Sequence, residues 1–368
     1  MLDKGKIGSL QAVFLLVSMV LPTALLYISA HTSRHAGQDG WISLMLAVFA
    51  ALAIARLAVS LARRFPGQTL FQFPEHILGR WPGKAVAVLY VWWFFHMNAE
   101  IIRQFGNFLV AAFMTHTPLI VFELLIVLIA AYAVRGGLEV FTRANQIILP
   151  FILGLIIITN ILIAPEIDLK KLLPVFSDSG AVPVLKGAVM PASWLGEIVI
   201  VAVLLPYLDR GQKAFKIAVT ATLITGLILL ITFVTDIALF SPQLTVAALF
   251  PELSKVRIIS LGNFLERLEA ITMGIWIAGG LIKISLFYWA AVLGSAQCLE
   301  LKDYRPLVLP AGVILLALSV MLHENIIEQV NFLGAFWGPY ALFLFQTGIP
   351  LFLLAAAAAR GLGGQERQ

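Results

Sequence analysis

Two ionisable residues lie deep inside apolar stretches that are long enough to cross a membrane. Glu197 follows Gly196 in the sixth such stretch, and Lys283 follows the small residue Gly279 in the eighth. A charge inside a membrane is costly, so residues of this kind mark functional sites by default. Glu197 and Lys283 are each suited to three tasks: binding the opposite charge of a ligand, exchanging a proton, or pairing with each other. The sequence leaves all three open.

Two further groups of charges occupy the third and eighth apolar stretches. Glu100 and Arg103 are three residues apart and therefore share one face of a helix. The eighth stretch carries Glu266, Arg267 and Glu269 near its start. We expect these side chains to face the interior of the protein as intramembrane ion pairs, with Arg103 paired to Glu266 or Glu269. Because they lie near helix ends, long side chains among them are also able to reach the membrane surface.

Prolines interrupt the first and the sixth apolar stretches. Pro22 lies in the middle of SMVLPTALLY (18–27), and Pro191 lies in VMPASWLGE (189–197). A broken helix in a membrane frees backbone groups that lipid cannot satisfy but a small ligand can. Interruptions at corresponding places in two halves are typical of inverted repeats with a site near the midplane. The alternative is that both prolines are packing kinks, which are common in membrane helices.

Composition identifies the elements that must position these residues. The chain has 368 residues, of which 60% are hydrophobic and only 12% are charged, and its mean hydropathy is +0.95. About 20 mostly apolar residues are needed for each span. The sequence therefore predicts an all-α integral membrane protein with ten transmembrane helices, arranged as a five-plus-five inverted repeat in which helices 1 and 6 are broken. The predicted spans are 9–30, 40–61, 84–112, 118–134, 143–164, 183–206, 214–240, 259–293, 305–322 and 334–358.

The charge pattern and the loop lengths indicate the orientation and the domain organisation. Basic residues concentrate in the segments on the side of the N-terminus, which places both termini in the cytoplasm. The loops are too short to hold a separate soluble domain. We expect residues 1–368 to form one polytopic domain, with repeats at about 7–164 and 183–358 and a disordered tail at 361–368.

Several function classes lack any motif. The single cysteine, Cys298, excludes an intrachain disulfide framework and a cysteine-based metal site. The sequence has no G-x-x-x-x-G-K-[ST], H-E-x-x-H or G-x-S-x-G pattern, so we expect no enzyme activity, no metal and no cofactor. No basic stripe lies outside the loops at the membrane surface, so we expect no nucleic-acid partner.

Seven segments in a fixed order carry a resemblance to a known family. They are GQDGWISLMLA (37–47), RRFPGQTLFQF (63–73), RGGLEVFTRANQIILP (135–150), IDLKKLLPVF (167–176), GEIVIVAVLLPYLD (196–209) and DYRPLVLPAG (303–312), with IWIAGGLIKIS (275–285) before the last. Together they resemble the B subunit of spore germinant receptors, the GerAB family of spore germination proteins. The resemblance covers roughly residues 7–350.

That resemblance implies a fold, a role and partners. The family belongs to the amino acid–polyamine–organocation transporter superfamily, with a LeuT-type inverted repeat. Its members sit in the inner membrane of the endospore, recognise a nutrient germinant, often an amino acid, and act with an A subunit and a lipoprotein C subunit. In place of the glycine that family members usually have in span one, this chain has Pro22, followed by the retained Thr23. The pocket residues implied beside the breaks are Pro22, Thr23, Ala24, Ser193, Trp194, Gly196 and Glu197, and those implied on spans three and eight are Trp93, His96, Trp276, Gly279 and Lys283.

Three functions remain open at this point. The first is a nutrient-sensing receptor subunit in which ligand binding shifts a two-state helix bundle. The second is a proton-coupled amino-acid transporter in which Glu197 or Lys283 carries the proton. The third is a structural subunit, or one that lets water or ions through, with no ligand of its own.

Overall fold

The structure is a computed structural model that describes residues 2–3, 5–176, 180–259 and 268–363. Within these residues all regular structure is helical, apart from one isolated bridge between Ile7 and Leu208. The longer helices are α1 (Ser9–Ala36), α2 (Gly40–Arg63), α4 (Arg80–Ala112), α5 (Leu119–Gly136), α6 (Leu138–Ile163), α7 (Ala181–Leu195), α9 (Ala214–Ala247), α11 (Leu268–Cys298), α12 (Val308–Met321) and α14 (Ile349–Ala359). Shorter pieces connect them. These are α3 (Phe73–Leu78), α8 (Val201–Leu204), α10 (Pro251–Ile258), α13 (Ile326–Phe332), the 3₁₀ turns η1 (Gly37–Asp39), η2 (Ala164–Glu166), η3 (Leu169–Leu172), η4 (Gly196–Ile200), η5 (Leu205–Tyr207), η6 (Gly211–Lys213) and η8 (Arg305–Leu307), and the π-helical η9 (Leu333–Trp337) and η10 (Tyr340–Gly348).

The described helices confirm an all-α membrane protein. Among the described residues, eight helical stretches are long and apolar enough to span a bilayer, or nine if α12 and α13 with their bend form one span. One of the eight, Ser9–Arg63, contains both α1 and α2, which η1 separates. Each predicted span overlaps a helix or a run of helical pieces, although residues 260–267 of the eighth span lie outside the described residues and the exact count of ten stays a prediction. The division into two repeats and the disordered tail also stay predictions.

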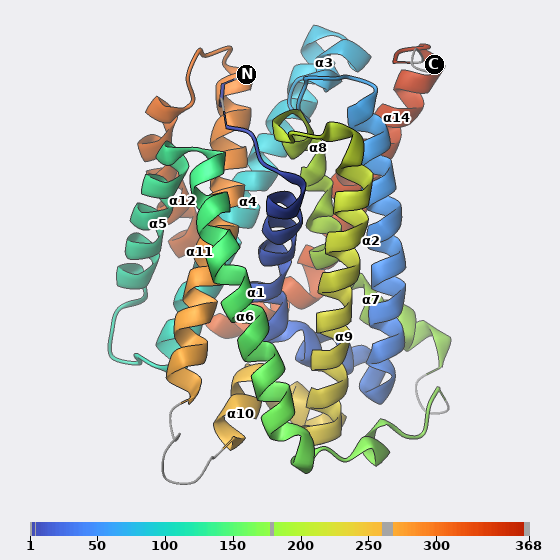
Figure 1. The fold of residues 1–368 in the computed structure, drawn as a ribbon, viewed down its shortest axis with the longest axis vertical. Helices are drawn as coiled ribbons and strands as arrows, with labels where there is room; N and C mark the ends of the chain where they lie inside the picture. The colour runs from blue at the N-terminus through green and yellow to red at the C-terminus, as the bar shows by residue number, and fades with distance from the viewer. Residues whose placement is uncertain (1, 4, 177–179, 260–267, 364–368) are drawn as a thin grey trace.

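The first helix lies inside the bundle, where the other helices surround it. Nearly every side chain of α1 from Leu15 to Ser29 is buried, and α1 packs against α6, α7, α9 and α11. The N- and C-terminal ends lie at the same end of the molecule, the top of Figure 1, together with α3 and α8. The short helix α10 lies at the opposite end (Figure 1). Apolar side chains such as Ile147 and Phe151 on α6 are exposed, as expected of a face in contact with lipid.

The predicted interruptions have different outcomes. Pro22 does not divide the first span, because α1 is helical from Ser9 to Ala36, and this corrects the expected break in helix 1. A proline removes one backbone hydrogen bond, but packed neighbours allow a membrane helix to continue through it. Pro191 does not interrupt the sixth span either, because α7 is helical through it to Leu195. The span changes further along the predicted stretch 189–197, where the chain continues as the 3₁₀ turn η4 from Gly196.

Two distortions were not predicted from the sequence. Between α12 and α13 the helical path bends by 98°. Within α9, Ser241 has φ 71° and ψ 161°, so the regular helix ends there and a short piece follows. The sequence predicts that the seventh span ends at residue 240, and the kink at Ser241 agrees with that end. The positive φ of Ser241, which precedes Pro242, was not predicted.

Candidate functional site

Three residues singled out by the sequence meet in the core of the bundle. The Lys283 ammonium on α11 donates to the Thr23 hydroxyl on α1 at 2.7 Å. The same ammonium lies 3.0 Å from Oε1 and 2.9 Å from Oε2 of Glu197 in η4. The side chains of Lys283 and Glu197 are only 1% and 3% exposed. Of the three roles left open for these residues, the structure therefore displays the pairing of one with the other.

Small residues bring the three elements close enough for these contacts. A Cβ atom on Gly279 of α11 would lie 2.9 Å from Cγ of Pro22, so only a glycine lets α11 approach α1 at this level. A Cβ atom on Gly196 would lie 2.1 Å from Oε1 of Gln346, whose amide donates to the Ser193 carbonyl at 2.7 Å. Gly279 and Gly196 thus set the distances between helices, as small residues commonly do in membrane proteins.

A small cavity opens beside Thr23. Its volume is about 20 Å³, and its walls are Pro22, Thr23, Leu26, Ile101, Gln104, Phe105, Phe108, Trp276 and Gly280. A space of this size holds roughly one water molecule. The walls are mostly apolar, but the buried Oε1 atom of Gln104 has no hydrogen-bond partner among the described residues. Buried polar atoms are normally paired, so the Oε1 atom of Gln104 is an unsatisfied acceptor on a residue of the cavity wall.

The other predicted pocket residues divide between the cavity and the surrounding core. Trp276 lines the cavity, and Ala24 is buried on α1 without lining it. Trp93 stacks on Phe345 with ring centroids 5.2 Å apart. The remaining predicted residues make local packing contacts: His96 meets the rings of Trp92, Phe332, Trp337 and Tyr340, Ser193 donates to the Met190 carbonyl, and Trp194 meets the ring of His31.

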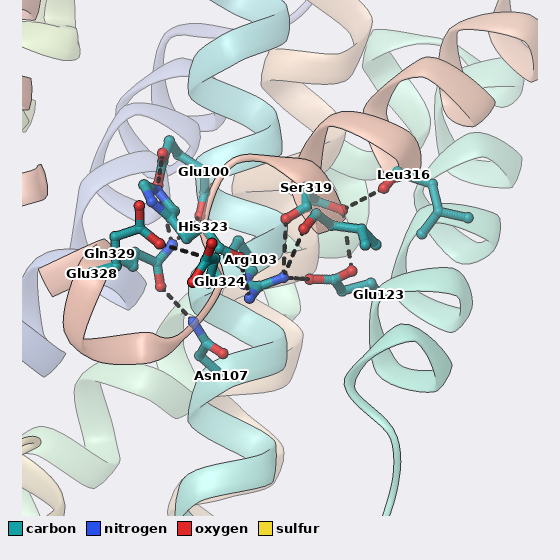
Figure 2. Close-up of polar contacts among 11 residues, drawn as sticks. Glu100, Arg103, Asn107, Glu123, Leu316, Ser319, His323, Glu324, Glu328 and Gln329 are labelled. Atoms are coloured by element: carbon teal, nitrogen blue, oxygen red, sulfur yellow. Dashed lines mark hydrogen bonds and ion pairs between the residues drawn. The ribbon is translucent and has the colours of Figure 1, made fainter.

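Arg103 holds the bend between α12 and α13 rather than an acid of the eighth span (Figure 2). Its guanidinium donates to the carbonyls of Ser319 and Val320 at 3.3 Å and of His323 at 2.6 Å. Its ion-pair partner is Glu123 on α5, at 3.9 Å. The last carbonyls of a helix lack partners within that helix, so a buried arginine is well suited to satisfy them.

Glu100 takes part in the same cluster from one turn away on α4 (Figure 2). Its Oε1 lies 2.6 Å from Nε2 of His323, and its Oε2 accepts a hydrogen bond from Gln329 at 3.1 Å. Gln329 in turn accepts from Asn107 at 2.8 Å. Glu100 and Arg103 therefore do face the interior, but they tie α4 to the α12–α13 bend.

Among the described residues, Arg103 pairs with Glu123 and not with Glu269, whereas the expected pairing with Glu266 stays a prediction. Glu266 and Arg267 lie outside the described residues, and Glu269 forms no ion pair with another described residue. The sequence analysis missed Glu123, Gln104 and His323. A signal for Glu123 was present, since it is a lone acid inside an apolar span, but nothing local indicated that His323 folds back into the bundle.

Comparison with known proteins gives consistent matches over nearly the whole chain. A family model described as "Spore germination protein" matches residues 6–327. Spore germination protein KB of Bacillus subtilis (strain 168) is 29% identical over 97% of this chain and 95% of its own length. Spore germination protein YndE of the same organism is 24% identical over 98% of each chain.

Two solved structures share the fold of this chain. MhsT in complex with L-phenylalanine aligns with a TM-score of 0.61 and 13% identity, over 95% of this chain and 98% of MhsT. Mhp1, a nucleobase-cation-symport-1 family transporter in a closed conformation with bromovinylhydantoin bound, aligns with a TM-score of 0.58 and 13% identity, over 98% of this chain and 77% of Mhp1. At these identities the likeness shows a common LeuT-like fold.

Proposed function

The chain belongs to the spore germination protein family, and from that premise we propose that it is the membrane subunit of a nutrient germinant receptor. In this proposal it binds a small nutrient, an amino acid, at the cavity beside Thr23. It works with the A and C subunits of the receptor in the inner membrane of the endospore, with both termini on the cytoplasmic side. It transmits a binding signal and performs no enzymatic reaction.

The observation that carries the proposal is a buried ion pair next to a cavity in which one polar wall residue has a side-chain oxygen without a hydrogen-bond partner. An amino acid carries one negative and one positive charge, and the Lys283–Glu197 pair offers the complement of each. Thr23 links that pair to the cavity, where Gln104 supplies a free acceptor. The apolar walls suit a nonpolar side chain, in line with the apolar pockets with few polar groups that bind small molecules. MhsT, which has the same fold, was solved with L-phenylalanine.

The present volume implies that binding requires movement. A cavity of about 20 Å³ holds roughly one water molecule and therefore does not admit an amino acid. Binding must therefore enlarge the cavity by separating α1 from α4 or α11, which supply its walls. A ligand that binds only the enlarged form shifts the bundle towards it, and partner subunits are able to detect that shift.

Ligand-dependent thermal stabilisation of the purified chain tests the proposal. A panel of amino acids, sugars and nucleosides should contain a ligand that raises the melting temperature by mass action. The shift should disappear in Thr23→Val and Gln104→Leu. The matched control is Thr159→Val on α6, because the Thr159 hydroxyl bonds only to carbonyls of its own helix. A ligand shift that persists unchanged in both cavity variants would overturn the assignment of the site.

A proton-coupled amino-acid transporter is the second candidate, because a buried acid–lysine pair is also able to carry a proton and because Mhp1 is a transporter of the same fold. The purified chain in liposomes would then accumulate the ligand when a pH gradient is imposed. Binding without accumulation favours the receptor. A normal germination response in spores carrying both cavity variants would instead favour a structural subunit or one that lets water or ions through.

A further inference from the structure

A second buried group of charges joins α10 to α9 at the end of the bundle opposite the termini (Figure 1). The Lys255 ammonium lies 2.6 Å from Oε2 of Glu252 and 3.2 Å from Oδ1 of Asp236. It also donates to the Thr235 hydroxyl at 3.3 Å. The side chains of the three charged residues are between 0% and 3% exposed. On the other side, the Ser29 hydroxyl of α1 donates to Oδ2 of Asp236 at 2.6 Å.

The group carries more negative than positive charge. Two carboxylates and one ammonium give a net charge of −1 when all three are ionised, and such a charge is expensive to bury. A single proton on one carboxylate makes the group neutral without breaking its contacts. Burial raises the pKa of Glu252 from 4.5 to about 7, although the ion pair with Lys255 opposes this. Burial lowers the pKa of Lys255, but its two acidic neighbours outweigh burial and raise it overall, so Lys255 keeps its charge.

The surroundings supply no further cation to Glu252 within the described part of the chain. Arg257 on α10 instead donates to the Ala112 carbonyl, and Lys171 in η3 donates to the Leu239 carbonyl. The helix α11, which packs against α10, carries Glu269 in its first turn, and α6 meets α10 through the apolar Ile163. The neighbouring turns of α1 bear Tyr27 and His31, whose rings lie 6.2 Å apart.

The docked position of α10 is connected to the cavity through aromatic rings. Phe250 immediately precedes α10, and its ring lies 5.5 Å from that of Tyr27 and 5.3 Å from that of Phe108. Phe108 lies 5.1 Å from Trp276, and both of these residues line the cavity. A displacement of α10 would therefore remove the support of one cavity wall.

We propose that Asp236, Glu252 and Lys255 form a proton-binding site, and that the bound proton holds α10 against α1 and α9. Loss of the proton leaves a buried net negative charge, which favours release of α10 towards water. Release would loosen Phe250 and the cavity wall behind it. The connection to ligand entry rests on the proposed function, whereas the proton site itself does not.

Amide hydrogen exchange on the full chain in lipid nanodiscs tests the site without any ligand. An acid whose pKa is raised in the docked state stabilises docking at low pH, and this stabilisation is lost as pH rises through about 7. With a pKa of 4.5 for the released side chain, the opening equilibrium should increase about tenfold between pH 6 and pH 8. The amides of 251–258, after correction for intrinsic exchange, should lose protection by that factor.

Two variants test whether the Glu252 carboxylate causes the change in protection with pH. In Glu252→Gln the protection of 251–258 should no longer change between pH 6 and pH 8, because the titrating carboxylate is gone. Glu328→Gln, which alters an exposed acid on α13, should keep the wild-type change. Protection in the wild-type chain that is independent of pH would overturn the proposal without any variant, as would a tenfold change that survives in Glu252→Gln. If the protection of 251–258 depends on pH as expected but no ligand raises the melting temperature, the proton site is supported and only the proposed ligand site is rejected.

Discussion

The buried Lys283–Glu197 pair allows a quantitative prediction about double substitution. Both side chains are at most 3% exposed, and their charged atoms lie 2.9 and 3.0 Å apart. Removing one partner leaves the other as an uncompensated buried charge, which costs about 3–5 kcal/mol. We therefore expect Lys283→Met and Glu197→Met each to lower the free energy of unfolding by about that amount. The Lys283→Met variant also loses the hydrogen bond to Thr23, worth about 1 kcal/mol.

The double variant should recover most of this loss. Replacing both partners of a buried ion pair by apolar residues of similar volume is often neutral, so Glu197→Met with Lys283→Met should fall within about 2 kcal/mol of the wild-type chain. Equilibrium unfolding in mixed detergent micelles, followed by tryptophan fluorescence, measures all four proteins. The exposed pair Lys84–Glu300, 3.0 Å apart, is the matched control and should show no measurable coupling. Losses that simply add in the double variant would refute the reasoning.

Three further predictions follow from single contacts. Gly279→Ala should lower the free energy of unfolding by about 1–3 kcal/mol, because the added Cβ would lie 2.9 Å from Cγ of Pro22. The control Gly154→Ala should leave the free energy of unfolding unchanged in the same assay, because no atom lies within 4 Å of its added Cβ. Arg103→Met should lower the free energy of unfolding by about 3–5 kcal/mol in that assay, because it leaves a buried carboxylate and three carbonyls at the α12–α13 bend without their partner. Asp3→Ala should speed proteolytic cleavage of the N-terminal segment, since the Asp3 carboxylate accepts hydrogen bonds from a backbone N–H of α6 and an indole of α11 at 3.0 Å.

The sequence was sufficient to predict where the long apolar helices lie, although their count as ten spans stays a prediction. Lipid requires each crossing segment to satisfy its own backbone and to present about 20 apolar residues, so a span is a local property that composition reveals. The predicted end of the seventh span at residue 240 and the change of the sixth span at Gly196 are examples. Both depend on residues that lie in the affected helix itself.

Pairings between helices were less predictable, because they depend on how helices rotate and bend in the bundle. The sequence proposed Lys283 and Glu197 as possible partners but placed Arg103 with the eighth span. In the structure, Arg103 instead pairs with Glu123 and donates to carbonyls at the α12–α13 bend, where His323 also contacts Glu100.

By itself, the sequence determined that this is an all-α membrane protein of the spore germination family, with charges in its core and a change of helix type in the sixth span. Hydropathy, proline and glycine act on the residues near them, so these features need no knowledge of distant neighbours. Only the tertiary structure decided that Pro22 leaves α1 continuous, that Thr23 meets the ion pair, and that Asp236 and Glu252 share one lysine. The contact between Thr23 and Lys283 joins residues far apart in the chain, and the ion pair between Asp236 and Lys255 joins two different helices, so both exist only once the helices have packed. The helix α1 continues through Pro22 among the helices packed around it.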